Sequence, residues 1–328
     1  MSKFLVVGGA GYIGSHLVKL LAEKGAVVAV LDDLSTGYRE AVPAGVKLYQ
    51  GSLANRDFVR QTLGDGPWTC VFHFAALSLV GDSLRDPLGY FRANVVNTLN
   101  LIEECVASGV NRLVFSSTAA VYGDAGERPI TEDYPTWPVN PYGHSKLMIE
   151  QMLSWADTAH GLRSACLRYF NAAGADPKGV LGESHHPETH LIPLCIDAAL
   201  GRRDALVIFG DDYPTPDGTC VRDYVHVEDL ARAHLACVPQ LHQGSFKLNL
   251  GTAHGYSVRQ VIDAVERVTG VKVPHKVGKR REGDPAVLVA NSMAAQRLLA
   301  WQPQMSDLDT LVASAYKWRL ARPKGYNT

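Results

Sequence analysis

The stretch KFLVVGGAGYIGSH, residues 3–16, joins a short apolar run directly to the spaced glycines Gly8, Gly11 and Gly14. The run 3–7 predicts a buried strand, and apolar residues at helical spacing follow the glycines. Three glycines at this spacing allow a tight turn and let the backbone approach a pyrophosphate at the start of the helix. The same pattern is also found in plain strand-to-helix turns, so the residues around it must decide between the two.

The next apolar run, AVVAVLDD at residues 26–33, ends in a carboxylate at Asp32. A carboxylate at this distance from the glycines accepts hydrogen bonds from the adenosine ribose and repels a 2′-phosphate. We therefore predict a nucleotide site that binds NAD rather than NADP. The neighbouring Asp33 is interpreted as a solvated turn residue.

Strands and helices continue to alternate along the chain, which is typical of an α/β fold with a doubly wound parallel sheet, the Rossmann arrangement. After residue 172 the segments rich in Pro, Gly, His and Asp indicate a second, smaller unit. We predict an NAD-binding domain over 1–172 and a smaller C-terminal α/β substrate domain over 173–328, with segments near 224–252 returning to the first. Further strands are expected at 46–50, 70–76, 112–117 and 164–170, and helices at roughly 86–109 and 141–160.

The composition excludes several classes of protein. The chain has 328 residues, 46% of them hydrophobic and 20% charged, with a formal net charge of −1. These values are those of an ordinary globular protein and give no electrostatic reason to expect nucleic acid or membrane as a partner. No apolar run approaches the ~18 residues of a membrane span. The six cysteines are scattered without a C-x-x-C pair, so we expect reduced thiols and a cytoplasmic location.

The stretch NPYGHSK, residues 140–146, places Tyr142 and Lys146 four residues apart. Asn140 followed by proline is a good helix start, and that interpretation is sufficient by itself. However, residues at i and i+4 share a helix face about 6 Å apart, and a nearby ammonium lowers the pKa of a phenol. Tyr142 is therefore a candidate base, with Lys146 as the group that tunes it.

The strand expected at 112–117 ends in the hydroxyl residues Ser116, Ser117 and Thr118. A hydroxyl at the carboxyl end of a parallel strand faces the crevice in which ligands bind in such folds. It could hold a substrate hydroxyl beside the candidate base, although capping of the strand end explains the same residues.

Taken in order, these motifs resemble the extended short-chain dehydrogenase/reductase family. Further blocks, including LRYFNAAGAD at 167–176, the stretch 208–226 and KRREGDPAVLVAN at 279–291, resemble those of the UDP-glucose 4-epimerases, the GalE type. The resemblance covers essentially the whole chain and implies an NAD-dependent isomerase of galactose metabolism. It implies interconversion of UDP-glucose and UDP-galactose through a transient 4-keto sugar, with tightly bound NAD taking and returning the hydride.

The resemblance also assigns site residues. It implies Tyr142 as the base, Thr118 as the hydroxyl that orients the sugar and Lys146 as the group that tunes Tyr142. The cofactor contacts it implies are Gly8, Gly11, Tyr12, Ile13, Gly14, Asp32, Ser52, Leu53, Phe74, Ala75, Ala76, Ser78, Asn94, Ser116, Tyr142, Lys146 and Phe170. The substrate contacts it implies are Thr118, Asn171, His190, Leu191, Val207, Phe209, Arg222, Tyr224, Arg281, Asp284 and Leu288.

Several positions depart from the pattern of related epimerases. Ser52 stands where Asp is frequent, Ser78 where some have Lys, and His190 where others have Asn. His144, between the candidate base and Lys146, has no role that the sequence indicates. Leu288 is intermediate in size at a position that lines the sugar pocket in relatives, so acceptance of N-acetylated sugars stays open.

Three other functions explain less of the sequence. A 4,6-dehydratase needs an extra acid and base after Thr118, where this chain has Ala119 and Ala120. A dehydrogenase that releases NADH leaves the uridine-type blocks unexplained, and a non-catalytic NAD sensor has no need of all three candidate catalytic residues.

Two further expectations concern metal and assembly. The spacing of His185, His186 and His190 matches no common metal motif, so we predict a polar substrate-side loop and no metal there. We expect a homodimer formed through the helices near 88–109 and 141–160.

Overall fold

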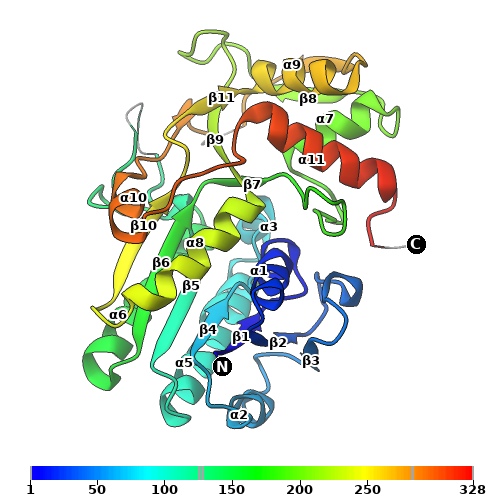
Figure 1. The fold of residues 1–328 in the computed structure, drawn as a ribbon. Coiled ribbons are helices and arrows are strands. Elements are labelled where there is room, and N and C mark those ends of the chain that lie inside the picture. Colours follow the sequence, from blue (N-terminus) through cyan, green and yellow to red (C-terminus); the bar gives the residue numbers. More distant parts are fainter. Residues whose placement is uncertain (1, 125, 127–128, 282–283, 327–328) are drawn as a thin grey trace.

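A parallel β-sheet forms the centre of the larger of two groups of elements (Figure 1). The computed structural model describes residues 2–124, 126, 129–281 and 284–326. Within them seven strands run in the order β10-β6-β5-β4-β1-β2-β3, and every pair is parallel. The predicted doubly wound sheet is thus confirmed. Its strands are β1 (Lys3–Val7), β2 (Val27–Asp32), β3 (Lys47–Gln50), β4 (Cys70–His73), β5 (Arg112–Thr118), β6 (Arg163–Tyr169) and β10 (Phe246–Leu250).

Helices cover both faces of this sheet, which explains why its central strands are apolar on both sides. Leu5 of β1 packs in one core cluster and Val6, its neighbour, in the other, and neither side chain is exposed. The first cluster includes residues of α2 (Arg56–Gly64), α5 (Asn97–Ala107) and α6 (Pro141–His160). The second includes residues of α1 (Tyr12–Glu23), α8 (Val227–Gln240) and α10 (Met293–Leu299).

The strand order reverses direction at β1, which has β2 on one side and β4 on the other. In open parallel sheets ligands bind in the crevice outside the carboxyl ends of the strands at such a reversal. The glycine turn follows β1 and enters this crevice, so the fold places the predicted nucleotide site where the topology provides one.

A smaller group of elements lies away from the amino-terminus, where Figure 1 shows α7, α9 and α11 gathered together. Their apolar faces share one buried cluster. The helices are α7 (Leu191–Ala199), α9 (Val258–Thr269) and α11 (Leu308–Ala321). The strands are β7 (Asn171–Ala173), β9 (Val221–His226), β11 (Gly255–Ser257) and β13 (Val287–Leu288), joined in one sheet through β9, and the pair β8 (Leu206–Phe209) and β12 (His275–Gly278).

The segment near 224–252 leaves this smaller group for the large sheet. Helix α8 packs against α1, and β10 pairs in parallel with β6. The domain boundary at residue 172 stays a prediction. None of the described helices is long and apolar enough to cross a membrane.

The helix expected at 86–109 is interrupted. Short helices α3 (Val80–Arg85) and α4 (Pro87–Tyr90) precede a π-helical turn at Phe91–Val96, and α5 begins only at Asn97. The Asn94 amide in that turn donates to the Leu77 carbonyl oxygen and the Ser145 hydroxyl. Both hydrogen bonds connect the π-helical turn to residues outside it, so the local sequence could not reveal them. Two 3₁₀ turns, at Arg39–Ala41 and Ala119–Val121, complete the described helices.

Candidate active site

A cavity of about 370 Å³ lies at the carboxyl ends of the strands. The glycine turn and Asp32 line it, and so do Tyr142, Lys146 and Thr118. Its wall therefore combines groups suited to a dinucleotide with groups suited to proton transfer.

Backbone packing explains the glycine turn. Gly8 has φ +80°, and a Cβ there would lie 2.4 Å from the Ala75 amide nitrogen. A Cβ on Gly14 would lie 2.2 Å from the Gly8 carbonyl oxygen, so α1 approaches the turn as closely as it does because both residues lack side chains. At Gly11, the N-cap of α1, no side chain caps the helix, and its amino-terminal end faces the cavity. A pyrophosphate fits such an uncapped helix end.

Asp32 is held rigidly at the edge of the cavity. Its Oδ2 accepts a hydrogen bond from the Ala10 amide, and its Oδ1 accepts one from the Leu34 amide, both at 2.9 Å. Burial raises the pKa of Asp32 above its usual value, and the two backbone hydrogen bonds partly offset this. Asp33 also lines the cavity, although the sequence interpretation left it in solvent. Asp33 directly follows β2, and this position at the carboxyl end of a strand could have indicated that it lines the cavity.

The start of α6 places Tyr142 and Lys146 in the cavity wall. The Asn140 side chain accepts from the Gly143 amide at 2.9 Å, as predicted for an N-cap. A Cβ on Gly143 would lie only 2.5 Å from the Ala120 carbonyl oxygen, so the first turn of the helix presses against the segment after β5. This contact brings Tyr142 beside Thr118, the last residue of β5.

Lys146 makes its hydrogen bond to the sheet. Its Nζ donates to the Ser116 carbonyl oxygen at 2.9 Å and lies 5.9 Å from the centroid of the Tyr142 ring. Burial lowers the pKa of Lys146 to about 7. Burial likewise raises the pKa of Tyr142 to about 12, against a hydrogen bond with Thr118 that acts in the opposite direction. The lowered tyrosine pKa expected from the sequence is therefore not a property of the chain alone, because desolvation outweighs the hydrogen bond with Thr118.

A buried polar network supports these groups from behind. The Ser117 hydroxyl donates to Glu150 at 2.6 Å, and Glu150 forms an ion pair with Arg168, also at 2.6 Å. The Ser116 hydroxyl hydrogen-bonds with Tyr169, a residue of the cavity wall that the sequence did not single out. Both contacts hold the end of β5 against β6 and α6.

All predicted cofactor residues except Asn94 line the cavity. Asn94 is fully buried and fixes Leu77 and Ser145, so its amide acts behind the cavity wall rather than in it. The sequence missed other lining residues, most of them small or apolar and without a motif. They are Leu31, Ser35, Thr36, Gly37, Gly51, Leu77, Ala93, Asn97, Tyr169, Ala172 and His185.

Among the predicted substrate residues, Thr118, Asn171 and His190 also line the cavity. Burial lowers the pKa of the neighbouring His185, and its hydrogen bonds to Glu183 and Glu188 outweigh this, raising the pKa to about 10.

The remaining predicted substrate residues lie outside the cavity lining, on the smaller group of elements. Arg222 forms an ion pair with Asp284 and pairs in register with Leu288 across β9 and β13. The Arg281 guanidinium lies 4.0 Å from the centroid of the Phe209 ring. The last three lie in or beside the apolar cluster of α7, α9 and α11. Leu191 begins α7, Val207 lies in β8, and Tyr224 is buried opposite Asn171.

Comparison with known proteins identifies the family. A family model described as the NAD dependent epimerase/dehydratase family matches residues 4–251. The UDP-glucose 4-epimerase of Streptococcus mutans is 50% identical over an alignment of 327 residues, which covers 98% of this chain and 98% of that one. The chain belongs to the NAD dependent epimerase/dehydratase family.

Solved structures agree with this membership. A crystal structure of a UDP-glucose 4-epimerase superposes with a TM-score of 0.97 at 46% identity and covers 100% of both chains. The Bifidobacterium longum UDP-glucose 4-epimerase, solved in complex with NAD+ and UDP, superposes with a TM-score of 0.94 at 37% identity, covering 99% of this chain and 100% of that one.

Two predicted departures from related epimerases affect the cofactor side of this family member. Ser52 and Ser78 both line the cavity, at the positions where an aspartate and a lysine were expected from related epimerases. The Ser52 hydroxyl accepts from the Ala54 amide at 3.2 Å. His144 is exposed, and only its backbone contributes to the helix start, by donating to the Asn140 carbonyl oxygen.

Proposed function

We propose that this chain interconverts UDP-glucose and UDP-galactose by inverting C4 of the sugar. The observation that carries the proposal is the cavity that joins Tyr142, Lys146 and Thr118 to the glycine turn and Asp32. Sequence identity of 47–50% to two UDP-glucose 4-epimerases, over 98% of this chain, supports the same substrate pair. The fold and the site therefore point to one reaction.

NAD fits the residues present. The helix end at Gly11 suits the pyrophosphate, Asp32 suits the adenosine ribose, and Lys146 suits the nicotinamide ribose. The small side chains that line the rest of the cavity leave room for it. Bound NAD+ supplies a hydride acceptor that takes hydrogen from C4 and later returns it.

In this proposal the catalytic residues move one proton. Tyr142, as phenolate, takes the proton from the sugar O4, and Thr118 holds that oxygen in line. Lys146 favours the phenolate by its charge once the cavity is filled and water is excluded. Tyr142 then returns the proton after the 4-keto sugar has turned over, which inverts C4 with no net oxidation.

The uridine diphosphate is assigned to the smaller group of elements. Arg222 and Arg281 carry the charge that a diphosphate requires, and Asp284 orients the first of them. Anchoring at these residues leaves the sugar free to rotate near Asn171. UDP-glucose and UDP-galactose are the main substrates in this proposal, and Leu288, intermediate in size, leaves the N-acetylated pair as further candidates.

Incubation of the purified protein with UDP-galactose and no added NAD tests the proposal. UDP-glucose should accumulate until the two sugars reach equilibrium. If none forms, and added NAD does not restore the reaction, the epimerase assignment is wrong. A lasting build-up of NADH would instead indicate a dehydrogenase.

We also propose a homodimer in the cytoplasm. Exposed apolar side chains gather on the predicted interface helices, with Leu88 75% exposed, Val96 50% and Trp155 73%. All six cysteines are free, which suits a reducing compartment. Sedimentation equilibrium should give twice the chain mass of 35.6 kDa, and Trp155→Glu should shift the protein toward monomer. A monomeric wild type at all concentrations would contradict the dimer.

A further inference from the structure

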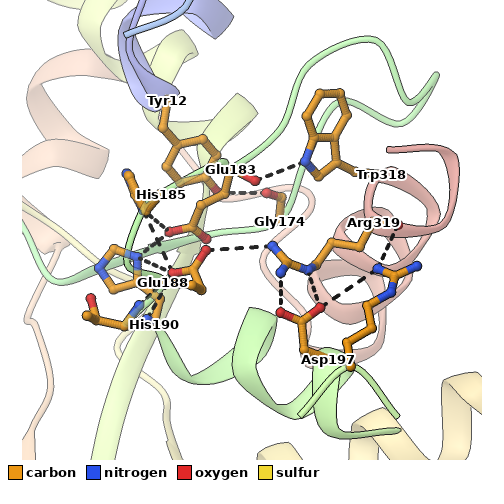
Figure 2. Close-up of polar contacts among 11 residues, drawn as sticks. Tyr12, Gly174, Glu183, His185, Glu188, His190, Asp197, Trp318 and Arg319 are labelled. Carbon is orange, nitrogen blue, oxygen red and sulfur yellow. Dashed lines mark hydrogen bonds and ion pairs between the residues drawn. The ribbon is translucent and has the colours of Figure 1, made fainter. Parts of the chain in front are cut away.

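Four side chains with metal-binding atoms converge in the segment between β7 and α7. Glu183, His185, Glu188 and His190 each direct one such atom to a common centre, and these atoms all lie within 4.8 Å of one another. Figure 2 shows the four side chains turned toward one another. No other group of three or more His, Cys, Asp or Glu side chains among the described residues meets this condition.

The contacts define the centre. Both imidazoles present Nδ1, and Glu183 Oε1 contacts both of these nitrogens, at 2.9 Å from that of His185. Glu188 Oε1 lies 3.8 Å from His185 Nδ1 and 3.9 Å from His190 Nδ1. Two nitrogens and two oxygens around one point form the donor set of a four-coordinate site.

A second observation concerns Glu188. Its side chain is 9% exposed, and its Oε2 is buried without a hydrogen-bond partner. That oxygen forms an ion pair with the Arg319 guanidinium at 3.7 Å, which is too long for a hydrogen bond. A buried carboxylate oxygen that lacks a hydrogen bond is costly, and a metal ion at the centre adds to the positive charge around Glu188.

Neighbouring elements hold the ligands in place. The Trp318 indole donates to the Glu183 carbonyl oxygen at 2.9 Å, and Arg319 is fixed by Asp197 at 2.8 Å (Figure 2). Tyr12 packs edge-on against His185 and donates its hydroxyl to the Gly174 carbonyl oxygen at 2.6 Å. Contacts of this kind orient the ligands of a metal site.

We propose that Glu183, His185, Glu188 and His190 bind one Zn²⁺. Metal binding displaces the ring protons, so two carboxylates and two neutral imidazoles carry a charge of −2, which one divalent cation neutralises. Imidazole ligands favour Zn²⁺ over Mg²⁺ and Ca²⁺, which prefer oxygen. Four protein ligands leave no position for a reactive water, so the ion is structural.

The site ties the β7–α7 segment to the cofactor cavity. His185 and His190 line that cavity, and Tyr12 belongs to the turn that begins α1. Zinc at this position fixes the segment from Gly174 to His190 against α1. His190 then serves as a metal ligand, in place of the sugar contact that the sequence suggested.

Metal analysis of the purified full-length protein tests the proposal. After dialysis against metal-free buffer the chain should retain about one zinc per chain, and Co²⁺ exchanged into the site should show the visible absorption of tetrahedral cobalt. Glu183→Gln and Glu188→Gln should each lose this stoichiometric zinc. His186→Asn is the matched control, because His186 is an exposed imidazole in the same segment that is not one of the four ligands.

A wild-type experiment decides the matter if the variants fail to fold. A chelator should remove the zinc and lower the melting temperature, and Zn²⁺ but not Mg²⁺ should restore it. Three results overturn the proposal: a wild type that neither retains nor rebinds zinc, full zinc binding in Glu188→Gln, or equal loss in His186→Asn. The first would leave the cluster as ion pairs alone, and the last would indicate adventitious binding to surface histidines.

Discussion

The Lys146 ammonium and the Tyr142 ring both face the cavity, but the hydrogen bond from Lys146 goes to the Ser116 carbonyl oxygen and not to the phenol. The ammonium lies 5.9 Å from the ring centroid, and burial raises the pKa of the phenol to about 12 against its hydrogen bond with Thr118. Burial thus disfavours the charged form of both residues. Bound ligands must add to the charge of Lys146 for Tyr142 to act as a base.

Burial raises the pKa of Tyr142 to about 12 in the free chain, so binding of NAD+, with its positively charged nicotinamide, should lower it. The phenolate absorbance of wild type minus Tyr142→Phe, titrated with and without NAD+, measures this shift. An unchanged pKa would mean that the cofactor does not tune the base.

Removal of the phenol hydroxyl tests its role in catalysis. Tyr142→Phe should lower kcat by roughly 10²–10⁴-fold, the usual contribution of a positioned acid–base group. Its circular dichroism and melting temperature should stay close to those of wild type, because the substitution keeps the ring and removes the hydrogen bond with Thr118. Tyr49→Phe, which removes a hydroxyl bonded to Asp65 on the surface, controls for loss of a tyrosine hydroxyl. Similar activity in both variants would exclude Tyr142 as the base.

Lys146 predicts a pH dependence of stability in the cofactor-free protein. Burial lowers its pKa to about 7, so between pH ~7 and pH ~10 the unfolded chain binds more protons than the folded one. The free energy of unfolding of wild type, relative to Lys146→Met, should therefore rise with pH across this window. As pH falls back to about 7 this gain should disappear, and below pH ~7 the difference should stay constant, because Lys146 is then protonated in both states. Chemical denaturation across the window measures it.

An exposed lysine provides the control for that experiment. Lys24→Met removes a surface lysine, and its stability relative to wild type should show no comparable rise. If Lys146→Met and Lys24→Met behave alike, the buried lysine is not the origin of the effect.

Asp32 should determine the choice of nucleotide. Asp32→Asn keeps a carbonyl acceptor for the Ala10 or Leu34 amide but removes the charge. NAD affinity should fall about 10- to 100-fold, the loss expected for a hydrogen bond to a charged group. The preference for NAD over NADP should shrink as well. Calorimetric titration with both nucleotides measures this, and an unchanged ratio would remove Asp32 from the assignment.

The sequence predicted best what is local. The glycine turn, Asp32 and the start of α6 each combine a strand end or a helix cap with residues a few positions away, so periodicity and turn chemistry reveal them. Gly143 shows the limit of this approach. Its lack of a side chain matters only because the Ala120 carbonyl oxygen, brought there by the fold, lies against it.

Tertiary contacts account for what the sequence could not show. Asn94 was expected at the cofactor but bridges Leu77 and Ser145 behind the cavity wall. The metal prediction compared histidine spacings alone, whereas the cluster joins two of those histidines to Glu183 and Glu188. No spacing rule covers four such side chains brought together by an irregular segment.

In the proposed reaction one hydrogen leaves C4 and the same hydrogen returns to the opposite face. UDP-galactose that carries deuterium at C4, incubated with the protein in ordinary water, tests this return. Mass spectrometry of the UDP-glucose formed should find the deuterium retained at C4, because a hydride held on the cofactor does not exchange with solvent. Replacement of the deuterium by solvent hydrogen would contradict the account.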